Sequence, residues 1–257
     1  MTEADRWDPD QYNRFAAERE QPYWDLVSLL APVDHPRVID LGCGDGRLTA
    51  LLHTTLGAAH TLGLDSSAAM ITASDDHSSA HITFARQDIG VWEEPDAFDV
   101  VLANASLQWV PDHAAVLGRW AHSLRPGGQL VVQVPSNSDH PAHLVAAELA
   151  TELLGDPPPD PVAQNVLAPE RYAVLLDQLG FERQHVRLQV YLHHLSSTVD
   201  VVEWVKGTTL TRFKPAFGPE GWPRFVDRYR ERLLALEGDR SPYLYPFKRI
   251  LMWGRRA

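Results

Sequence analysis

The chain has 257 residues, a length that suits one domain with insertions. Of these residues 44% are hydrophobic and 22% charged, which is typical of a globular protein. Its 34 acidic and 23 basic side chains give a net charge of −11, which argues against nucleic acid as the main partner. The chain has one cysteine, no apolar segment near about 18 residues and no signal-peptide core, so we expect a cytoplasmic protein that does not bind a membrane.

Residues 1–31 are predicted to form a helical N-terminal segment, because their apolar side chains recur at helical spacing. Pro22 is expected to begin a second helix there, at its first turn. Tyr12, Arg19 and Tyr23 add polar groups to the apolar face. Two interpretations therefore stay open: a helix that covers a sheet, or a cap over a pocket.

Residues 36–110 alternate between predicted strands and helices. The strands lack polar alternation, which is typical of parallel strands buried on both faces. This order predicts an α/β layered fold with right-handed crossovers. The strands are expected at 37–41, 60–64, 82–85 and 98–103, and the helices at 47–56 and after a cap at Ser66 or Ser67.

The second half of the chain is predicted to be mainly helical. A tight turn is expected at 125–128, and the proline-rich run 155–161 reads as an extended connector without helix. Thr198 is the expected cap of the helix that carries Val201 and Trp204. Further helices are expected at 113–124, around 143–154, at 169–179 and at 219–237, and strands at 129–134, 186–192 and 247–253.

Three glycines follow the first predicted strand at every second position: Gly42, Gly44 and Gly46. A tight turn alone accounts for one glycine, but three suggest that a ligand approaches the backbone closely. Dinucleotide-binding loops space their glycines two and then three apart. Here the spacing is two and two, and the preceding Asp40 would repel a pyrophosphate. The loop therefore favours S-adenosyl-L-methionine (SAM), with its cationic amino group, over NAD.

Polar side chains also follow the other parallel strands, at the edge where such sheets bind ligands. Asp65 follows the second strand, where its carboxylate can accept hydrogen bonds from both ribose hydroxyls. Asp88 and Ile89 follow the third strand and could bind and cover an adenine ring. Asn104 ends the fourth strand at the same edge.

The loop 40–46, together with Asp65, Asp88-Ile89 and the turn 125–128, resembles the class I SAM-dependent methyltransferases. Residues 7–12, 63–70 and 103–113 are similar to the trans-aconitate 2-methyltransferase family, and the likeness extends over almost the whole chain.

The resemblance implies a Rossmann-like sheet that is mostly parallel, with an antiparallel last strand and a helical substrate-side cap or insertion. It implies one methyltransferase domain over 1–257, with a helical cap at 1–31, a SAM-binding core at 32–135 and substrate-side elements at 155–240. The expected cofactor-binding residues are Asp40, Leu41, Gly42, Cys43, Gly44, Gly46, Asp65, Ser66, Met70, Asp88, Ile89 and Asn104.

The implied reaction is methyl transfer from SAM to a carboxylate of trans-aconitate or a similar small polycarboxylic acid. A carboxylate is already ionised at pH 7, so no general base and no catalytic triad are expected. Arg19 is the first choice for binding the unreactive carboxylates, before Arg212 with Lys214, and then Arg249. Gln108 and Trp109 are expected near the transferred methyl group, and Tyr12 and Tyr23 near the substrate or SAM.

Two other functions remain open. One is methylation of a different carboxylate or of a carrier-bound malonyl thioester, and the other is SAM binding without turnover. No metal is expected, because the histidine pairs His193-His194 and His140/His143 are not joined by a cysteine or carboxylate cluster. No feature of the sequence indicates an oligomeric state.

Overall fold

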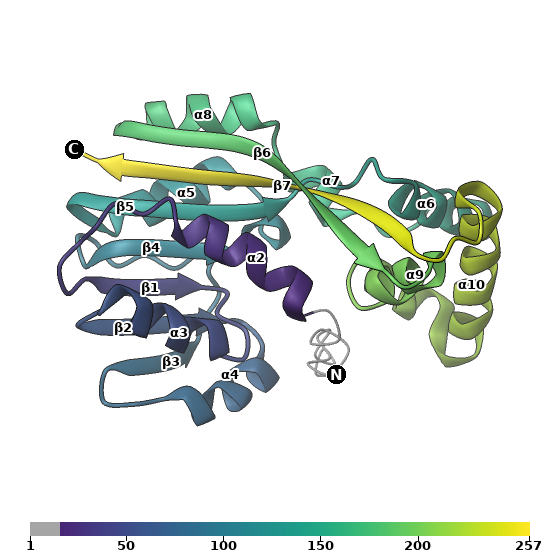
Figure 1. Cartoon of the computed structure of the whole chain (residues 1–257), viewed down its shortest axis with the longest axis horizontal. Helices are drawn as coiled ribbons and strands as arrows, with labels where there is room; N and C mark the ends of the chain where they lie inside the picture. The colour runs from purple at the N-terminus through teal and green to yellow at the C-terminus, as the bar shows by residue number, and fades with distance from the viewer. Residues whose placement is uncertain (1–15) are drawn as a thin grey trace.

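The computed structural model describes residues 16–257, with side chains from Glu20 onward. This part of the chain forms a seven-stranded sheet of order β3-β2-β1-β4-β5-β7-β6, in which β7 runs antiparallel to the other six strands. The predicted α/β fold, mostly parallel with an antiparallel last strand, is confirmed (Figure 1). The strands are β1 (Arg37–Leu41), β2 (His60–Asp65), β3 (Ile82–Arg86), β4 (Phe98–Asn104), β5 (Leu124–Pro135), β6 (Phe181–Leu195) and β7 (Tyr243–Arg256).

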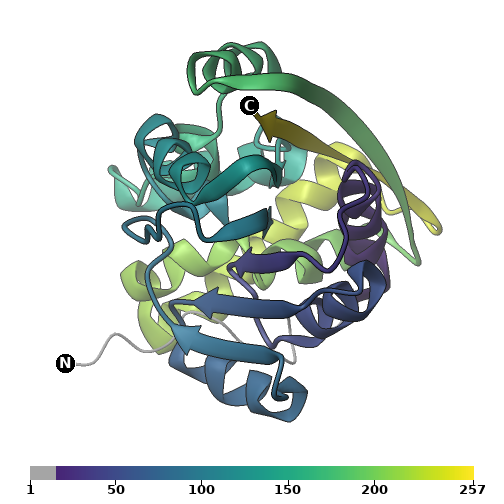
Figure 2. The same ribbon diagram turned by 90° about the vertical axis from the view of Figure 1, so that its left-hand side faces the viewer.

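Helices cover both faces of this sheet, as Figure 2 shows. Val38 and Val100 pack against the helices at 16–27 and 47–56 on one face, whereas Ile39 and Val101 pack against the helices at 113–122 and 169–178 on the other. Burial on both faces explains why these strands read as continuous apolar runs. The helices are α2 (Ala16–Val27), α3 (Arg47–Leu56), α4 (Ala68–Ser74), α5 (His113–His122) and α8 (Pro169–Gln178), with the 3-10 helices η1 (Asp75–His77) and η2 (Leu107–Trp109) in the loops.

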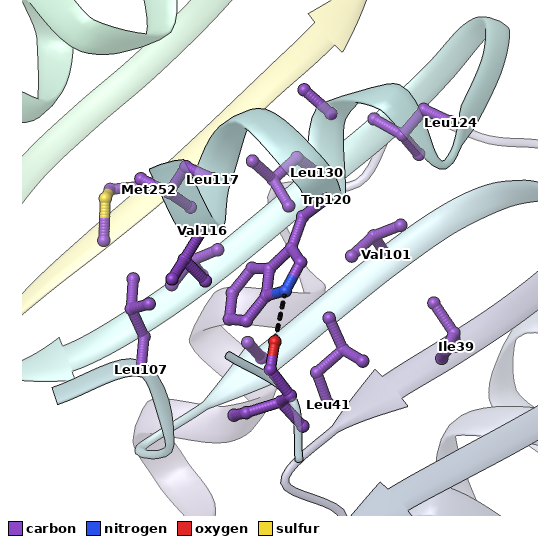
Figure 3. Packing of buried hydrophobic residues seen from close by; sticks show 14 of the residues in the cluster. Ile39, Leu41, Val101, Leu107, Val116, Leu117, Trp120, Leu124, Leu130 and Met252 are labelled. Atoms are coloured by element: carbon purple, nitrogen blue, oxygen red, sulfur yellow. Dashed lines mark hydrogen bonds between the residues drawn. The ribbon is translucent and has the colours of Figure 1, made fainter. Parts of the chain in front are cut away.

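Trp120 of α5 links the core to the loop that follows β3. Its side chain is fully buried beside Leu117 and Leu41 (Figure 3). Its indole Nε1 donates a hydrogen bond to the carbonyl of Ile89 at 3.0 Å. A buried tryptophan needs such a partner for its N–H, and here the bond fixes the loop that carries Asp88.

A second group of helices lies beyond the sheet, around the far ends of the two longest strands (Figure 1). β6 and β7 pair along almost their whole length and carry Tyr245 and Phe247 into a separate apolar core with Trp204, Phe225 and Tyr229. The elements of this part are α6 (Pro141–Leu154), α7 (Pro161–Asn165), α9 (Thr198–Lys206), η3 (Thr209–Phe213) and α10 (Lys214–Glu237).

In the described range, 16–257, no helix combines the length and the apolar composition that a membrane span requires.

The N-terminal prediction at Pro22 is wrong, because α2 continues through this proline without a break. A proline inside a helix costs about 3 kcal/mol. The burial of Tyr23 and Leu26 against the sheet offsets this cost by holding the helix on both sides of the proline. In its described part, the N-terminal helix therefore covers the sheet.

Three further local predictions are corrected by the structure. The expected turn 125–128 lies inside β5 as an irregularity in its pairing with β4, since Gly127 takes a φ of 76° there. Pro161 begins the short helix α7, which Asp160 caps by accepting hydrogen bonds from two backbone N–H groups. Ser197, and not Thr198, caps α9, in a capping box completed by Asp200.

Candidate active site

The glycine loop after β1 folds tightly against the loop after β4. Gly42, Gly44 and Gly46 all have positive φ angles, of 84°, 58° and 79°. A Cβ on Gly42 would lie only 2.3 Å from the Cβ of Ser106, whose hydroxyl donates to the carbonyl of Leu41 at 2.6 Å. At Gly44, by contrast, a Cβ would meet nothing within 4 Å. The backbone therefore faces open space at this one glycine, as a ligand cradle requires.

Asp65 at the end of β2 is held by backbone donors from two elements. One carboxylate oxygen accepts the N–H of Gly44 at 3.0 Å and the other accepts the N–H of Ser67 at 2.9 Å. Ser67 also caps α4, because its hydroxyl accepts the N–H of Met70. These bonds fix a half-buried carboxylate beside the open side of the glycine loop.

A cavity of about 320 Å³, here called the glycine-loop cavity, opens at the carboxyl ends of β1, β2 and β4. Most of the residues predicted to bind the cofactor line it. Its lining consists of Gly42, Gly44, Asp65, Ser66, Met70, Asp88, Ile89, Asn104, Ala105, Ser106, Trp109 and Val110.

Asp40, Leu41, Cys43 and Gly46 lie behind this lining. Asp40 is 3% exposed and accepts a hydrogen bond from the Thr49 hydroxyl at 2.6 Å. Burial is the main cause that raises the pKa of Asp40 to about 7, and the charge of Asp65 adds to it. Burial likewise raises the pKa of the Cys43 thiol, which makes it a packed side chain and not a nucleophile.

A second cavity, here called the Arg249 cavity, lies between the sheet and the helical group. It shares Asn104, Ala105 and Trp109 with the glycine-loop cavity, so the two spaces meet at the end of β4. Its lining consists of Asn104, Ala105, Gln108, Trp109, Pro135, Asn137, His143, Val162, Trp204, Thr208, Thr209, Phe247 and Arg249.

Arg249 brings a buried positive charge to this second cavity. It is 5% exposed, and its guanidinium lies 4.7 Å from the centre of the Phe247 ring. Its Nη1 donates to the side-chain oxygen of Gln133 at 3.2 Å. Among the lining residues that the structure describes, it is the single arginine or lysine. The cavity is therefore suited to an anionic ligand of small size.

Comparison with known proteins identifies the family. The profile of a family described as a methyltransferase domain matches residues 12–186. The chain is 40% identical to trans-aconitate 2-methyltransferase of Deinococcus radiodurans, over 97% of this chain and 98% of that one. It is 34% identical to the protein of the same name from Mycobacterium tuberculosis, over 96% and 95% of the two chains. This chain belongs to the trans-aconitate 2-methyltransferase family.

Solved structures of more distant methyltransferases share the fold. One is phosphoethanolamine N-methyltransferase 2 of Haemonchus contortus in complex with S-adenosylhomocysteine, with a TM-score of 0.57 and 16% identity over 92% of this chain and 52% of that one. Another is a methyltransferase-like protein of Bacillus halodurans, with a TM-score of 0.60 and 14% identity over 92% and 99% of the chains. The chain thus has the fold of the class I methyltransferases. As a member of the trans-aconitate 2-methyltransferase family, it uses SAM as its cofactor.

The residues of the glycine-loop cavity fit SAM by their chemistry. Asp65 offers carboxylate oxygens of the kind that bind a ribose, and Ile89 and Met70 offer apolar surface for an adenine ring. Asp88 is oriented by the N–H of Gly90, which donates to it at 2.8 Å. The buried Oδ1 of Asn104 has no hydrogen-bond partner in the described part of the chain, as expected of an acceptor that meets a ligand.

The residues predicted to bind the substrate fall into different places. Gln108 and Trp109 line the Arg249 cavity, as does Arg249, the last of the predicted arginines. Arg212 does not line it, because it pairs with Asp160 at 2.5 Å and packs over the Phe213 ring. The neighbouring Lys214 lies over the ring of Trp222.

Tyr23 lies in the core between α2 and α3, where it is 1% exposed and donates to the carbonyl of Leu48 at 3.1 Å. Its place is outside the lining of both cavities. Tyr12 and the side chain of Arg19 lie outside the described residues.

Sequence reasoning missed His143 and Thr209 as lining residues. His143 stood out only as a metal ligand by type, yet in the range 16–257 no metal-binding group of His, Cys, Asp and Glu side chains is found. His143 lies in the first turn of α6, which His140 caps by accepting the N–H of Ala142, and no local sequence signal indicated that this turn borders a cavity.

Proposed function

We propose that this enzyme methylates a carboxylate of trans-aconitate, or of a closely similar small polycarboxylate, to give the monomethyl ester. One observation carries the proposal: the glycine-loop cavity and the Arg249 cavity meet at Asn104, Ala105 and Trp109. The proposed cofactor site thus adjoins a small cationic site. The curated relatives from Deinococcus radiodurans and Mycobacterium tuberculosis are named for the same substrate.

The proposed methyl transfer requires no acid or base from the side chains. When bound, SAM supplies a methyl group on a positively charged sulfur. The accepting carboxylate is ionised at pH 7, so the chain has no proton to remove. Its task is to hold the carboxylate in line and to exclude water, and such positioning can supply roughly 7–11 kcal/mol of the barrier. The absence of a required general base is therefore part of the proposal.

Arg249 is the proposed anchor for a carboxylate that does not react. A guanidinium can bind a carboxylate through two parallel hydrogen bonds, which fixes its orientation as well as its place. Burial between Phe247 and Gln133 holds this guanidinium in one position. The interaction is expected to be strong because little water competes for either charge.

Gln108 and Asn104 are the proposed positioning residues where the cavities meet. The side-chain nitrogen of Gln108 donates to the carbonyl of Ala105 at 2.7 Å, and its buried Oε1 has no hydrogen-bond partner within the described residues. Asn165 of α7 donates to the Gln108 carbonyl at 3.1 Å and steadies this turn. Acceptor oxygens here would attract a cationic methyl donor and turn substrate carboxylates toward Arg249.

Tyr12 keeps its predicted role at the substrate or at SAM, and Arg19 keeps its predicted role at the substrate carboxylates. Arg212 is paired with Asp160 and has no direct part in this proposal. A cytoplasmic location, suggested by the composition and the lone Cys43, completes the proposal.

The direct test is to incubate the protein with methyl-labelled SAM and a panel of acids, and to look for a base-labile methyl ester by mass spectrometry. We expect ester from trans-aconitate in preference to saturated tricarboxylates, monocarboxylates and a malonyl carrier. Ester on the carrier alone would support the thioester function instead. Binding of SAM without any ester across the panel would support a non-catalytic role.

Replacement of Arg249 tests the anchor. Arg249→Met should raise the KM for trans-aconitate by about 10- to 100-fold, the usual effect of losing a hydrogen bond to a charged group. Arg249→Lys should keep only part of the wild-type affinity for trans-aconitate. Arg255→Met on the same strand is a matched control, because Arg255 bonds the carbonyl of Gly127 away from the cavity. Equal KM changes in both variants, or a parallel loss of SAM affinity, would remove Arg249 from this role.

A further inference from the structure

His143 and Thr209 form a polar pair in the wall of the Arg249 cavity that the proposed function does not yet use. His143 stands in the first turn of α6 and is 8% exposed, and Thr209 begins η3. Both residues line the cavity. The Thr209 hydroxyl lies 3.2 Å from Nδ1 of His143, whereas the buried Nε2 has no hydrogen-bond partner in the described part of the chain.

The surroundings keep this imidazole neutral. Burial is the main cause that lowers the pKa of His143 to about 4; the charge of Asp160 opposes it, and His140 and Arg212 reinforce it. A neutral imidazole carries one N–H. If the Thr209 hydroxyl donates to Nδ1, that N–H is on Nε2, the nitrogen without a partner.

The nearby ion pair of Arg212 and Asp160 cannot take the place of the Nε2–H of His143 as a donor to the substrate. Arg212 is 2.5 Å from a carboxylate oxygen of Asp160, and both side chains are mostly buried. Asp160 also accepts the N–H of Val162 at 3.0 Å, which ties the pair to the start of α7. The charge of Arg212 is thus largely balanced by a carboxylate of the chain itself.

We propose that Thr209 and His143 form a second carboxylate-binding point, in which the Thr209 hydroxyl orients the ring and the Nε2–H donates to a substrate carboxylate. This inference rests on the proposed function and deepens it. A tricarboxylate with one reacting group brings two others into the cavity. Arg249 binds one of them, and the neutral histidine binds the second without adding another buried charge.

This arrangement gives the site its selectivity for three carboxylates over two. A carboxylate buried without a donor costs free energy, and so does a buried N–H without an acceptor. A dicarboxylate that leaves His143 unpaired therefore binds less well than a ligand that satisfies both points.

Substitutions at His143 test the donor. His143→Leu and His143→Asn should raise the KM for trans-aconitate by about 10- to 100-fold, while kcat and the SAM dissociation constant stay within about threefold. His143→Gln should restore most of the affinity, because the glutamine amide nitrogen reaches about the place of Nε2. Thr209→Val should weaken trans-aconitate binding, unlike Thr211→Val, whose hydroxyl bonds the carbonyl of Thr208.

Equal losses in the Gln and Leu variants would overturn the proposal. So would losses of kcat and SAM affinity that follow the KM, since these would indicate structural damage. Turnover of trans-aconitate by the wild-type enzyme tests the proposed function by itself. The ratio of the variant's KM to the wild-type KM tests only the role of His143 and Thr209. An enzyme that methylates trans-aconitate with unchanged KM in all His143 variants would therefore retain the function and lose this inference.

A panel of competitors identifies the carboxylate itself. Glutaconate, itaconate and mesaconate each lack a different one of the three carboxylates of trans-aconitate. In His143→Leu we expect the inhibition constants to rise for the two acids that keep the carboxylate bound by His143. The inhibition constant of the acid that lacks this carboxylate should stay within about twofold of the wild-type value. A uniform rise for all three, or no rise for any, would contradict a specific contact.

Discussion

Asp40 and Asp65 are two carboxylates at neighbouring strand ends that have different environments and different tasks. Asp65 is half-buried and accepts two backbone N–H groups, which hold its carboxylate in place at the edge of the glycine-loop cavity. Asp40 is buried behind the loop and is bonded by Thr49. The first is therefore placed to bind a ligand, and the second supports the loop.

Asp65→Ala should weaken SAM binding, measured by calorimetry, by about 10- to 100-fold, because charged hydrogen bonds to the ribose are lost. The effect on the KM for trans-aconitate should be much smaller. Asp76→Ala is a suitable control, since this exposed carboxylate lies in η1, outside the lining of both cavities. Unchanged SAM affinity in Asp65→Ala would rule out the ribose role.

Asp40 should make the stability of the enzyme depend on pH. Its pKa rises from 3.8 to about 7 on folding, so between these values the folded state binds more protons than the unfolded state. The free energy of unfolding therefore falls as pH rises from 4 to 7, by up to ~4 kcal/mol from this residue.

Asp40→Asn removes this titration. In urea unfolding at pH 5 and pH 8 without SAM, the decline in stability between the two pH values should be smaller in the variant than in the wild type. Parallel pH dependence in the two proteins would show that Asp40 is ionised in the folded state throughout.

At the scale of elements, the gathering of residues around the glycine-loop cavity was predictable because it depends on local chain order. Parallel strands end at one edge of a sheet, so Gly42, Asp65 and Asn104 had to gather there once the strands were recognised. The substrate side was not predictable in this way. The position of Arg249 follows from the pairing of β7 with β5, and that of His143 from the packing of α6 against η3.

The same distinction explains the errors in the local predictions. Backbone preference alone predicts that Pro22 begins a helix and that Pro161 belongs to an extended connector. The structure reverses both, because the tertiary burial of Tyr23 holds α2 together and the carboxylate of Asp160 caps α7. Propensity is a weak guide where packing or a cap supplies more free energy.

The turn from β1 into α3 should tolerate no side chain at Gly42. Gly42→Ala combines a φ of 84° with a Cβ 2.3 Å from Ser106, whereas Gly57→Ala at the end of α3 has a φ of 57° and free space. Both variants should lose about 1–2 kcal/mol of stability for the left-handed backbone, and Gly42→Ala a further ~1–3 kcal/mol for the overlap. Equal losses in denaturant unfolding would show that the two loops can separate.

In the whole molecule, the β6–β7 ribbon joins the sheet to the helical group and brings their surfaces together (Figure 1). The sheet supplies Asp65 and the glycine loop, the ribbon supplies Arg249, and the helical group supplies His143 and Thr209. The division into a cap at 1–31, a SAM-binding core at 32–135 and substrate-side elements at 155–240 stays a prediction, and His143 of α6 lies outside the last of these ranges.

We propose that the two adjoining cavities hold the cofactor and a polycarboxylate at the same time. The most direct measurement is a crystal structure of the enzyme with S-adenosylhomocysteine and trans-aconitate. We predict the nucleoside in the glycine-loop cavity beside Asp65, one carboxylate on Arg249 within about 3 Å, and another facing the sulfur near Asn104. Trans-aconitate bound elsewhere, with Arg249 bonded only to groups of the chain itself, would contradict it.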